Sequence, residues 1–142
     1  SQLINVYIEK FGYPFSRQSV VDRNQICLER FWVNYQFQNE FNPFHDHTGI
    51  FSFAIWLKIP TSWKEQNKLK FLEGINETQK KAGCFEFQYI NTTGKIQHFA
   101  YRLDNSYEGK MLFFPASFQH AVHPFYKCEE PRISIAGNIS IK

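Results

Sequence analysis

The sequence contains no hydrophobic run long enough to cross a membrane. A membrane-spanning helix needs about 20 consecutive apolar residues, and the most apolar stretch here is the short segment FSFAIWLKI at 51–59. The N-terminus also lacks the charged and then apolar pattern of a secretory signal. We therefore expect a cytoplasmic protein that does not act at a membrane. The chain begins at Ser1 and not at Met, which leaves room for a further N-terminal piece.

Cysteine is scarce, and charge of either sign is not concentrated anywhere. The three cysteines, Cys27, Cys84 and Cys128, are an odd number at wide spacing, which does not predict a disulfide framework. Reduced cysteines are what the cytoplasm favours. The 16 basic and 13 acidic side chains give a formal net charge of only +3. Without a basic run there is no electrostatic reason to expect a nucleic-acid partner, and the oligomeric state is left open.

Aromatic residues, in contrast, are abundant. They make up 18% of the chain and include 16 Phe. Aromatic and β-branched side chains fit the half-buried surface of a sheet, so they favour a β-rich fold. Because single domains typically contain about 100–200 residues, we predict one domain over residues 1–142.

Alternation of apolar and polar residues predicts a series of strands. Two of them flank the segment NTTG, in which Gly94 can supply the positive φ of a hairpin turn. A short helix is expected after Pro60, because Ser62 and Glu65 fit a capping box. Residues 3–9 fit either a strand or a short helix. The expected strands cover 26–37, 51–59, 84–90, 95–103, 110–116 and 131–141.

This pattern of roughly six to eight short strands with little helix suits sandwiches, barrels and jelly rolls. We predict a mainly β, cupin-like jelly roll with minor helix. The two sheets of a jelly roll leave a mouth between them, where residues from widely separated strands converge.

Three histidines have the spacing of a metal site. His45 and His47 lie two positions apart, so on an extended strand their side chains point the same way, while Asp46 points the other way unless the chain turns. His120 follows a strand far along the sequence. Imidazole suits iron, copper and zinc, and two neighbouring ligands plus one distant ligand are typical of a facial site on a jelly roll. The alternative is that the three are unrelated surface or core histidines. His98 and His123 remain, and a structural role is open to either of them.

Arg132 and Ser134 form a second group, on the strand that follows His120. They lie two positions apart and therefore on one side of an apolar strand. A buried unpaired charge is unfavourable, so the guanidinium needs a partner. Arginine can bind a carboxylate through two parallel hydrogen bonds, and serine can add a hydroxyl donor. The pair therefore indicates either a clamp for a carboxylate co-substrate beside His120 or an ion pair of Arg132 with a core Glu or Asp.

Several blocks of the sequence, in this order, resemble a known family. They are WVN, FNPFHDHTG, FSFAIWLKIP, FFPASFQHAVHPF and RISIAGN. They resemble the small 2-oxoglutarate- and Fe(II)-dependent oxygenases, in particular an uncharacterised branch found in marine phages and bacteria, over about residues 30–140. The resemblance implies a double-stranded β-helix and, for a phage protein, the cytoplasm of an infected host. It also implies Fe(II) held by an H-x-[DE] pair and a distant His, with an Arg-x-Ser clamp for 2-oxoglutarate. The matching residues are His45, His120, Arg132 and Ser134.

One position departs from the wider superfamily. The carboxylate of H-x-[DE] is replaced by His47, a change that this branch tends to share. We expect His45 and His47 to be ligands together with His120. Two alternatives stay open: Asp46 turns inward as the ligand, or an H-x-G motif ending at Gly49 leaves room for a halide. Asn34, on a preceding strand, is a further candidate for contact with the keto acid end of 2-oxoglutarate or with a ligand.

The sequence thus predicts an Fe(II)- and 2-oxoglutarate-dependent hydroxylase with an unidentified small-molecule or peptide substrate. Two other classes remain. One is a cupin-type three-His metal enzyme that does not use 2-oxoglutarate, which would have no need of Arg132 and Ser134. The other is a jelly-roll binding module without chemistry, for which three grouped histidines are not expected.

Overall fold

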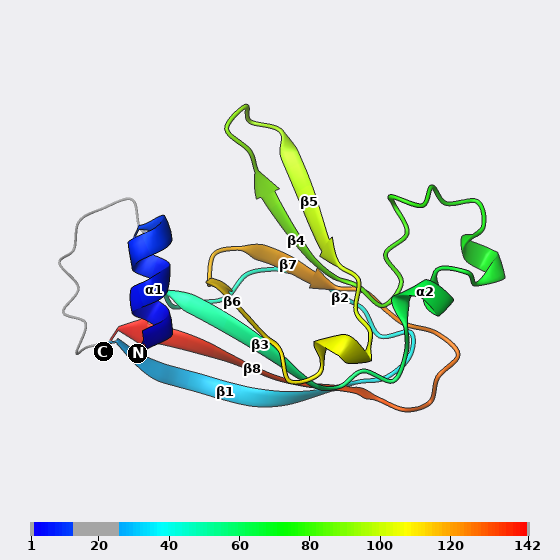
Figure 1. Cartoon of the computed structure of the whole chain (residues 1–142), viewed down its shortest axis with the longest axis horizontal. Helices are drawn as coiled ribbons and strands as arrows, with labels where there is room; N and C mark the ends of the chain where they lie inside the picture. Colours follow the sequence, from blue (N-terminus) through cyan, green and yellow to red (C-terminus); the bar gives the residue numbers. More distant parts are fainter. Residues whose placement is uncertain (1, 13–25, 142) are drawn as a thin grey trace.

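The computed structural model describes residues 2–12 and 26–141, and its fold is mainly β (Figure 1). The helical elements are α1 (Gln2–Phe11), α2 (Trp63–Gln66) and the 3-10 turns η2 (Lys70–Leu72) and η3 (Asn105–Tyr107). The strands are β1 (Ile26–Gln36), β2 (Asn42–His45), β3 (Phe51–Lys58), β4 (Phe85–Ile90), β5 (Ile96–Tyr101), β6 (Met111–Pro115), β7 (Gln119–Val122) and β8 (Arg132–Ile141).

The strands form two antiparallel four-stranded sheets. The first sheet has the order β1-β8-β3-β6, and the second has the order β2-β7-β4-β5. Most neighbours in a sheet are distant in the sequence, because the chain crosses repeatedly from one sheet to the other. This arrangement is the predicted jelly roll, the double-stranded β-helix, and the prediction of the fold is confirmed.

Local turn chemistry explains the hairpin between β4 and β5. The side-chain Oδ1 of Asn91 accepts hydrogen bonds from the backbone N–H groups of Thr93 and Lys95. Gly94 has a φ of 80°, a conformation that glycine adopts without steric penalty. The predicted hairpin is therefore confirmed, with its turn at the expected place.

The predictions for the helical segments need two refinements. Residues 3–9 lie in helix α1, which places Ile4 against Phe51 on the first sheet. The capping box before α2 is wrong in detail, because Ser62 makes no side-chain bond to the helix. Its backbone oxygen instead accepts from the N–H groups of Glu65 and Gln66. Among the described residues, no helix has the length and apolar character needed to cross a membrane.

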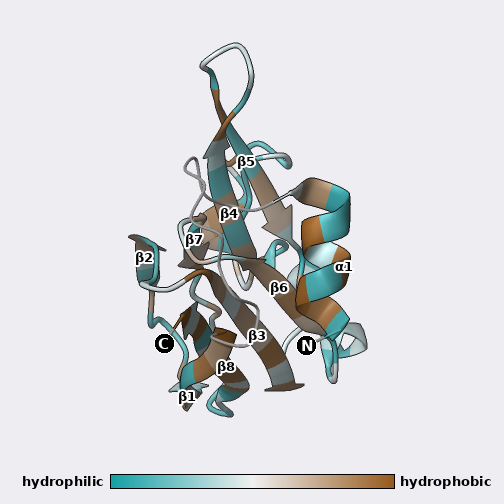
Figure 2. Cartoon of the chain, turned by 90° about the vertical axis from the view of Figure 1, so that its left-hand side faces the viewer, coloured by the Kyte–Doolittle hydropathy of each residue, from teal (hydrophilic) through white to brown (hydrophobic). Residues whose placement is uncertain are grey.

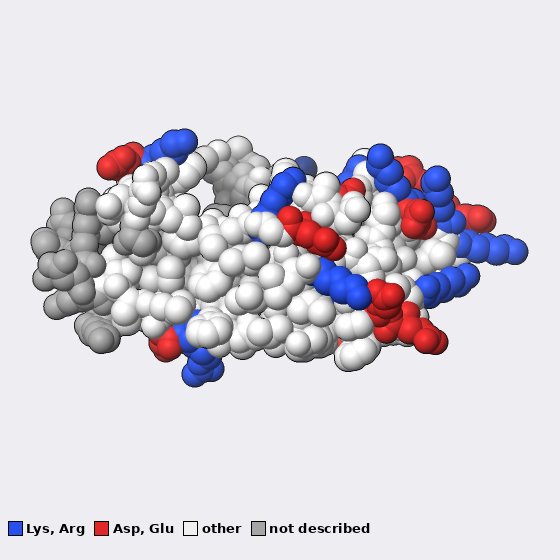
Figure 3. All heavy atoms as spheres, turned by 60° about the horizontal axis from the view of Figure 1, so that its bottom comes forward, with Lys and Arg blue, Asp and Glu red and all other residues white. Residues whose placement is uncertain are grey.

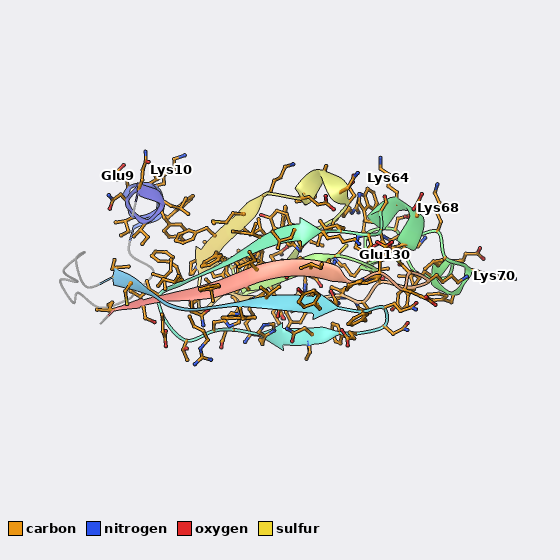
Figure 4. All side chains as sticks on the ribbon, turned by 90° about the horizontal axis from the view of Figure 1, so that it is seen from below. Glu9, Lys10, Lys64, Lys68, Lys70 and Glu130 are labelled. Carbon is orange, nitrogen blue, oxygen red and sulfur yellow. The ribbon has the colours of Figure 1, made fainter. Side chains whose placement is uncertain are left out.

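The core lies between the two sheets. Trp56 of β3, Phe85 of β4 and Phe114 of β6 belong to one buried cluster, and brown, hydrophobic segments mark β3, β6 and β8 (Figure 2). Helix α1 packs on the opposite face of the first sheet, so that α1 and β2 lie on opposite sides of it (Figure 4). The second sheet with β2 and β7 therefore faces the inner side of β1, β3 and β8.

Charged side chains gather toward the end of the molecule that carries α2 (Figure 3). Basic and acidic side chains are intermixed there. Lys58 and Glu130 form one of the exposed ion pairs of the protein, with 2.6 Å between Nζ and Oε2. A row of basic and acidic side chains also crosses the middle of this face, and the area below it is largely uncharged. The face shown therefore presents no broad surface of a single sign.

Candidate metal centre

The structure brings the three predicted histidines together. His45 ends β2, His120 lies opposite it in the register of β7, and His47 follows β2 by two residues. One possible ligand atom from each imidazole lies within 4.8 Å of the other two. The antiparallel pairing of β2 with β7 therefore produces a compact group from residues that are far apart in the sequence.

Backbone carbonyls fix the orientation of two of these rings. The Nδ1 of His45 lies 2.7 Å from the oxygen of Pro43, and the Nδ1 of His120 lies 2.9 Å from the oxygen of Phe118. A carbonyl can only accept, so each Nδ1 donates its proton, and the Nε2 of a neutral ring in this tautomer carries the lone pair. This is the usual arrangement around metal-binding histidines, in which the second ring nitrogen is held by an outer partner.

The imidazole of His47 comes close to that of His120. The Nε2 of His47 lies 3.2 Å from the Nε2 of His120, and two lone pairs at that distance repel unless a proton or a cation lies between them. Burial lowers the pKa of His120 to about 4, and burial together with His45 lowers the pKa of His47. Both rings are therefore neutral at pH 7, which is the form of imidazole that binds metals.

The structure also bears on the two alternatives, which were Asp46 as a ligand and an H-x-G motif that leaves room for a halide. Asp46 is exposed and does not belong to the three-histidine group. Gly49 has a φ of 98°, and a Cβ atom there would lie 2.7 Å from the backbone oxygen of Ile139. The geometry therefore places His47 beside His45 and His120, and close packing accounts for the glycine of the H-x-G motif.

The histidines face a cavity of about 640 Å³ between the sheets. Its apolar lining includes Trp56, Phe85 and Phe114, and the ring of Phe85 stacks on His120 with 5.3 Å between the centroids. Trp32 of β1 lines the cavity as well, and its ring centroid lies 5.7 Å from that of His47. The histidines thus border a space that is mostly apolar and large enough for small organic molecules.

Arg132 lines the same cavity and has a mere 3% of its surface exposed. Its Nε, at 2.8 Å, and its Nη2 donate to the Oε1 of Gln36. Nη1 donates to the oxygen of Gly83 at 2.7 Å, and Nη2 donates to the oxygen of His123 at 3.1 Å. All of these acceptors are neutral.

The ion-pair interpretation of Arg132 is therefore wrong, because no carboxylate pairs with it within the described parts of the chain. Among the described residues, the acidic group that influences the pKa of Arg132 is the thiol of Cys84. Burial raises the pKa of this thiol to about 11, so it is neutral at pH 7. Burial lowers the pKa of Arg132 to about 10, which leaves the guanidinium charged at pH 7.

Two further predicted residues reach the cavity. Ser134 and Asn34 are directly opposite each other in the register of β8 and β1, and both line the space near Arg132. Gln36, opposite Arg132 in the same register, was missed by the sequence analysis. Its position two residues after Asn34, on the same face of β1, was the available signal.

His98 and His123 contact a different group, the buried carboxylate of Glu86. His123 Nε2 lies 2.7 Å from Glu86 Oε2, and His98 Nδ1 lies 3.4 Å from Oε1. Lys81 Nζ lies 3.0 Å from the same Oε1. Burial alone would raise the pKa of Glu86, but the hydrogen bonds from Lys81 and His123 outweigh it and hold the pKa below its usual value. The network fixes the His123 segment, whose backbone oxygen contacts Arg132.

We expect Glu86→Gln to destabilise the fold by about 2–3 kcal/mol at pH 7, because hydrogen bonds to charged groups contribute about 1.5–3 kcal/mol. A lowered pKa in the folded state stabilises the protein above the unfolded pKa of about 4.3, and this stabilisation is lost as the pH falls through the folded value. Urea unfolding at pH 7 and in acid measures the difference between wild type and variant.

The matched control is Glu130→Gln, which removes an exposed carboxylate paired with Lys58 and is expected to leave stability nearly unchanged. A difference between wild type and Glu86→Gln that stays constant or grows in acid would contradict the assigned role of Glu86.

Comparison with known proteins identifies the family. A family model described as "Putative 2OG-Fe(II) oxygenase" matches residues 30–138, most of the chain. The matched segment runs from β1 into β8 and contains the three histidines, Arg132 and Ser134. No curated protein matches the sequence. With its jelly-roll fold and its three-histidine group, the chain belongs to this 2OG-Fe(II) oxygenase family.

Proposed function

We propose that the protein is an Fe(II)- and 2-oxoglutarate-dependent oxygenase that hydroxylates a small-molecule or peptide substrate. One observation carries this proposal: a single cavity contains three converging imidazoles and a buried guanidinium that has no carboxylate partner among the described residues. The imidazoles suit a metal ion, and the guanidinium suits an anion. A co-substrate that has both a metal-chelating end and a distal carboxylate would use both groups.

The donor set fits iron. Imidazole nitrogen is a common ligand of iron in proteins, and His45, His47 and His120 would hold the ion. The 3.2 Å approach of the Nε2 atoms of His47 and His120 supports this assignment, because the two nitrogens are close enough to share one partner, which is a proton in the free protein and would be the metal ion when it is bound. The carbonyls of Pro43 and Phe118 keep the Nδ1 atoms of the other two rings engaged.

When bound, Fe(II) and 2-oxoglutarate supply the oxidation: dioxygen is reduced, 2-oxoglutarate becomes succinate and carbon dioxide, and one oxygen atom enters a C–H bond of the substrate. Arg132 would attract and orient the distal carboxylate, with Ser134 as an additional hydroxyl donor. Asn34 would contact the co-substrate or a ligand from β1. The buried rings of Trp56, Phe85 and Phe114 form an apolar wall of the cavity.

The proposal is tested by following 2-oxoglutarate and succinate by NMR in aerated solution. We expect the iron-loaded protein to form succinate slowly without any added substrate, and the metal-free protein to form none. If iron binding is confirmed and 2-oxoglutarate persists unchanged, the proposed co-substrate is wrong.

A second candidate is a three-His metal enzyme that does not use 2-oxoglutarate. It is favoured by the third member of the group, which is the imidazole of His47 and not a carboxylate. Such an enzyme would form no succinate, and substitution of Arg132 would not change the ligand binding of its metal ion. The buried charge of Arg132 in the same cavity favours the first candidate.

The contributions of His47 and Asp46 can be separated by two variants. We expect His47→Gln to lower the iron content strongly, because it removes a nitrogen that lies 3.2 Å from His120 Nε2. Asp46→Asn should have a mild effect, since this carboxylate is exposed and outside the group. Iron content is measured on both variants side by side after identical loading. The reverse order of effects would identify Asp46 as the ligand.

A further inference from the structure

The orientation of the Gln36 carboxamide is fixed by its partners. Its Nε2 donates to the backbone oxygen of Glu40 at 2.8 Å, so this end of the amide must be the nitrogen. Its Oε1 therefore faces Arg132 and accepts from both Nε and Nη2. This is the edge of a guanidinium that a carboxylate would otherwise occupy.

The other hydrogen-bond acceptors of Arg132 are neutral as well. Its other acceptors are backbone oxygens, and one hydrogen of Nη1 has no acceptor among the described residues. The nearby carboxylate of Glu40 accepts from the backbone N–H of Phe37 at 2.7 Å, and that of Glu86 is held by Lys81 and two histidines. Gln36 is therefore the one side chain, among the described residues, that accepts hydrogen bonds from Arg132, and a carboxylate at this position would pair directly with the guanidinium.

We propose that Gln36 is a positioning residue that holds Arg132 through a neutral acceptor, so that the guanidinium keeps its positive charge for one anionic group in the cavity. The inference rests on the proposed function in identifying that group as the distal carboxylate of 2-oxoglutarate. Glutamate at this position would offer Arg132 the same oxygen but would also pair with its charge. With the neutral amide of Gln36, the site therefore prefers a ligand that brings its own carboxylate. A glutamate at position 36 would remove this preference.

The test compares glutaramate, which carries one carboxylate and one amide, with the neutral diamide glutaramide as ligands of the metal-free protein. The two probes differ in one terminal group, so the ratio of their affinities reports the preference of the cavity for a carboxylate over a neutral amide. Calorimetry at pH 7 is expected to give a ratio of at least about tenfold for the wild type, the size of one charge-assisted interaction. General damage to the cavity weakens both probes and leaves this ratio unchanged.

Three variants separate charge from shape. Gln36→Glu is expected to bring the ratio close to one, because the introduced carboxylate neutralises Arg132. Gln36→Met keeps the size of the side chain without its polar atoms, so it should weaken both probes and retain the preference. Gln38→Glu makes the same change of charge two residues away, where no hydrogen bond to Arg132 is formed, and should keep the wild-type ratio.

The outcomes distinguish this inference from the proposed function. A wild-type ratio near one, or a Gln36→Glu ratio equal to that of the wild type, would overturn the role of Gln36 even if the iron-loaded protein converts 2-oxoglutarate. An equal loss of preference in Gln36→Met and Gln36→Glu would show that shape and not charge matters, and would overturn it too. The expected ratios without any succinate formation would support the role of Gln36 and refute the oxygenase.

Discussion

His120→Ala is expected to abolish stoichiometric Fe(II) binding. His120 is 4% exposed, and its Nε2 lies within reach of the other two imidazoles. Its Nδ1 is already bonded to the oxygen of Phe118, so the side chain is held in place before any ion arrives. Removing an outer-shell partner of a metal site weakens binding about 10–100-fold, and we expect the loss of a direct ligand to exceed that. Anaerobic calorimetry with Fe(II) measures the affinity.

The control for this experiment is His98→Ala. His98 is also a histidine of the second sheet, but it contacts Glu86 and not the three-histidine group. The His98→Ala variant should bind Fe(II) with the same affinity as the wild type. Unchanged iron affinity in His120→Ala, with the variant shown to be folded, would contradict the assignment of the metal centre.

Arg132→Lys is expected to weaken 2-oxoglutarate binding about ten- to a hundredfold, which corresponds to about 1.5–3 kcal/mol for hydrogen bonds to a charged group. Lysine keeps the charge but lacks the planar fork of donors. It cannot donate at the same time to Gln36, Gly83 and His123, as Arg132 does. Iron affinity should change far less, because Arg132 is not part of the three-histidine group.

Arg102→Lys provides the matched control, since Arg102 is exposed and stacks on Trp63 at 4.7 Å. The two variants are compared by titration of 2-oxoglutarate into the anaerobic Fe(II) protein, together with their melting temperatures. A variant of Arg132 that loses thermal stability but keeps its affinity for 2-oxoglutarate would show that this arginine serves the fold alone.

Much of the fold could be predicted because the relevant signals are local. Alternation identified the long strands, and the segment around Gly94 identified the hairpin. Strands β2 and β7 were not predicted. Each has four residues, too few for a period to be recognised, and β2 contains Pro43. Their conformation comes from the pairing of β2 with β7 and of β7 with β4, which is a tertiary effect.

The site was predictable to a similar degree. The spacing of His45, His47 and His120 indicated a metal group, and the structure brings these three side chains together. The partners of Arg132 could not be predicted, because they depend on where the backbone oxygens of Gly83 and His123 lie in space. No local pattern in the sequence carries that information.

The most direct test of the proposed function is the anaerobic titration of 2-oxoglutarate into the Fe(II)-loaded wild-type protein, followed by metal-to-ligand charge-transfer absorbance. Bidentate chelation of iron by the keto acid end produces such a band, which a carboxylate alone does not. We predict a saturable band that requires more 2-oxoglutarate in Arg132→Lys and is absent in His120→Ala. No band in the wild type, with iron confirmed to be bound, would contradict the oxygenase and favour a three-His enzyme that does not use 2-oxoglutarate.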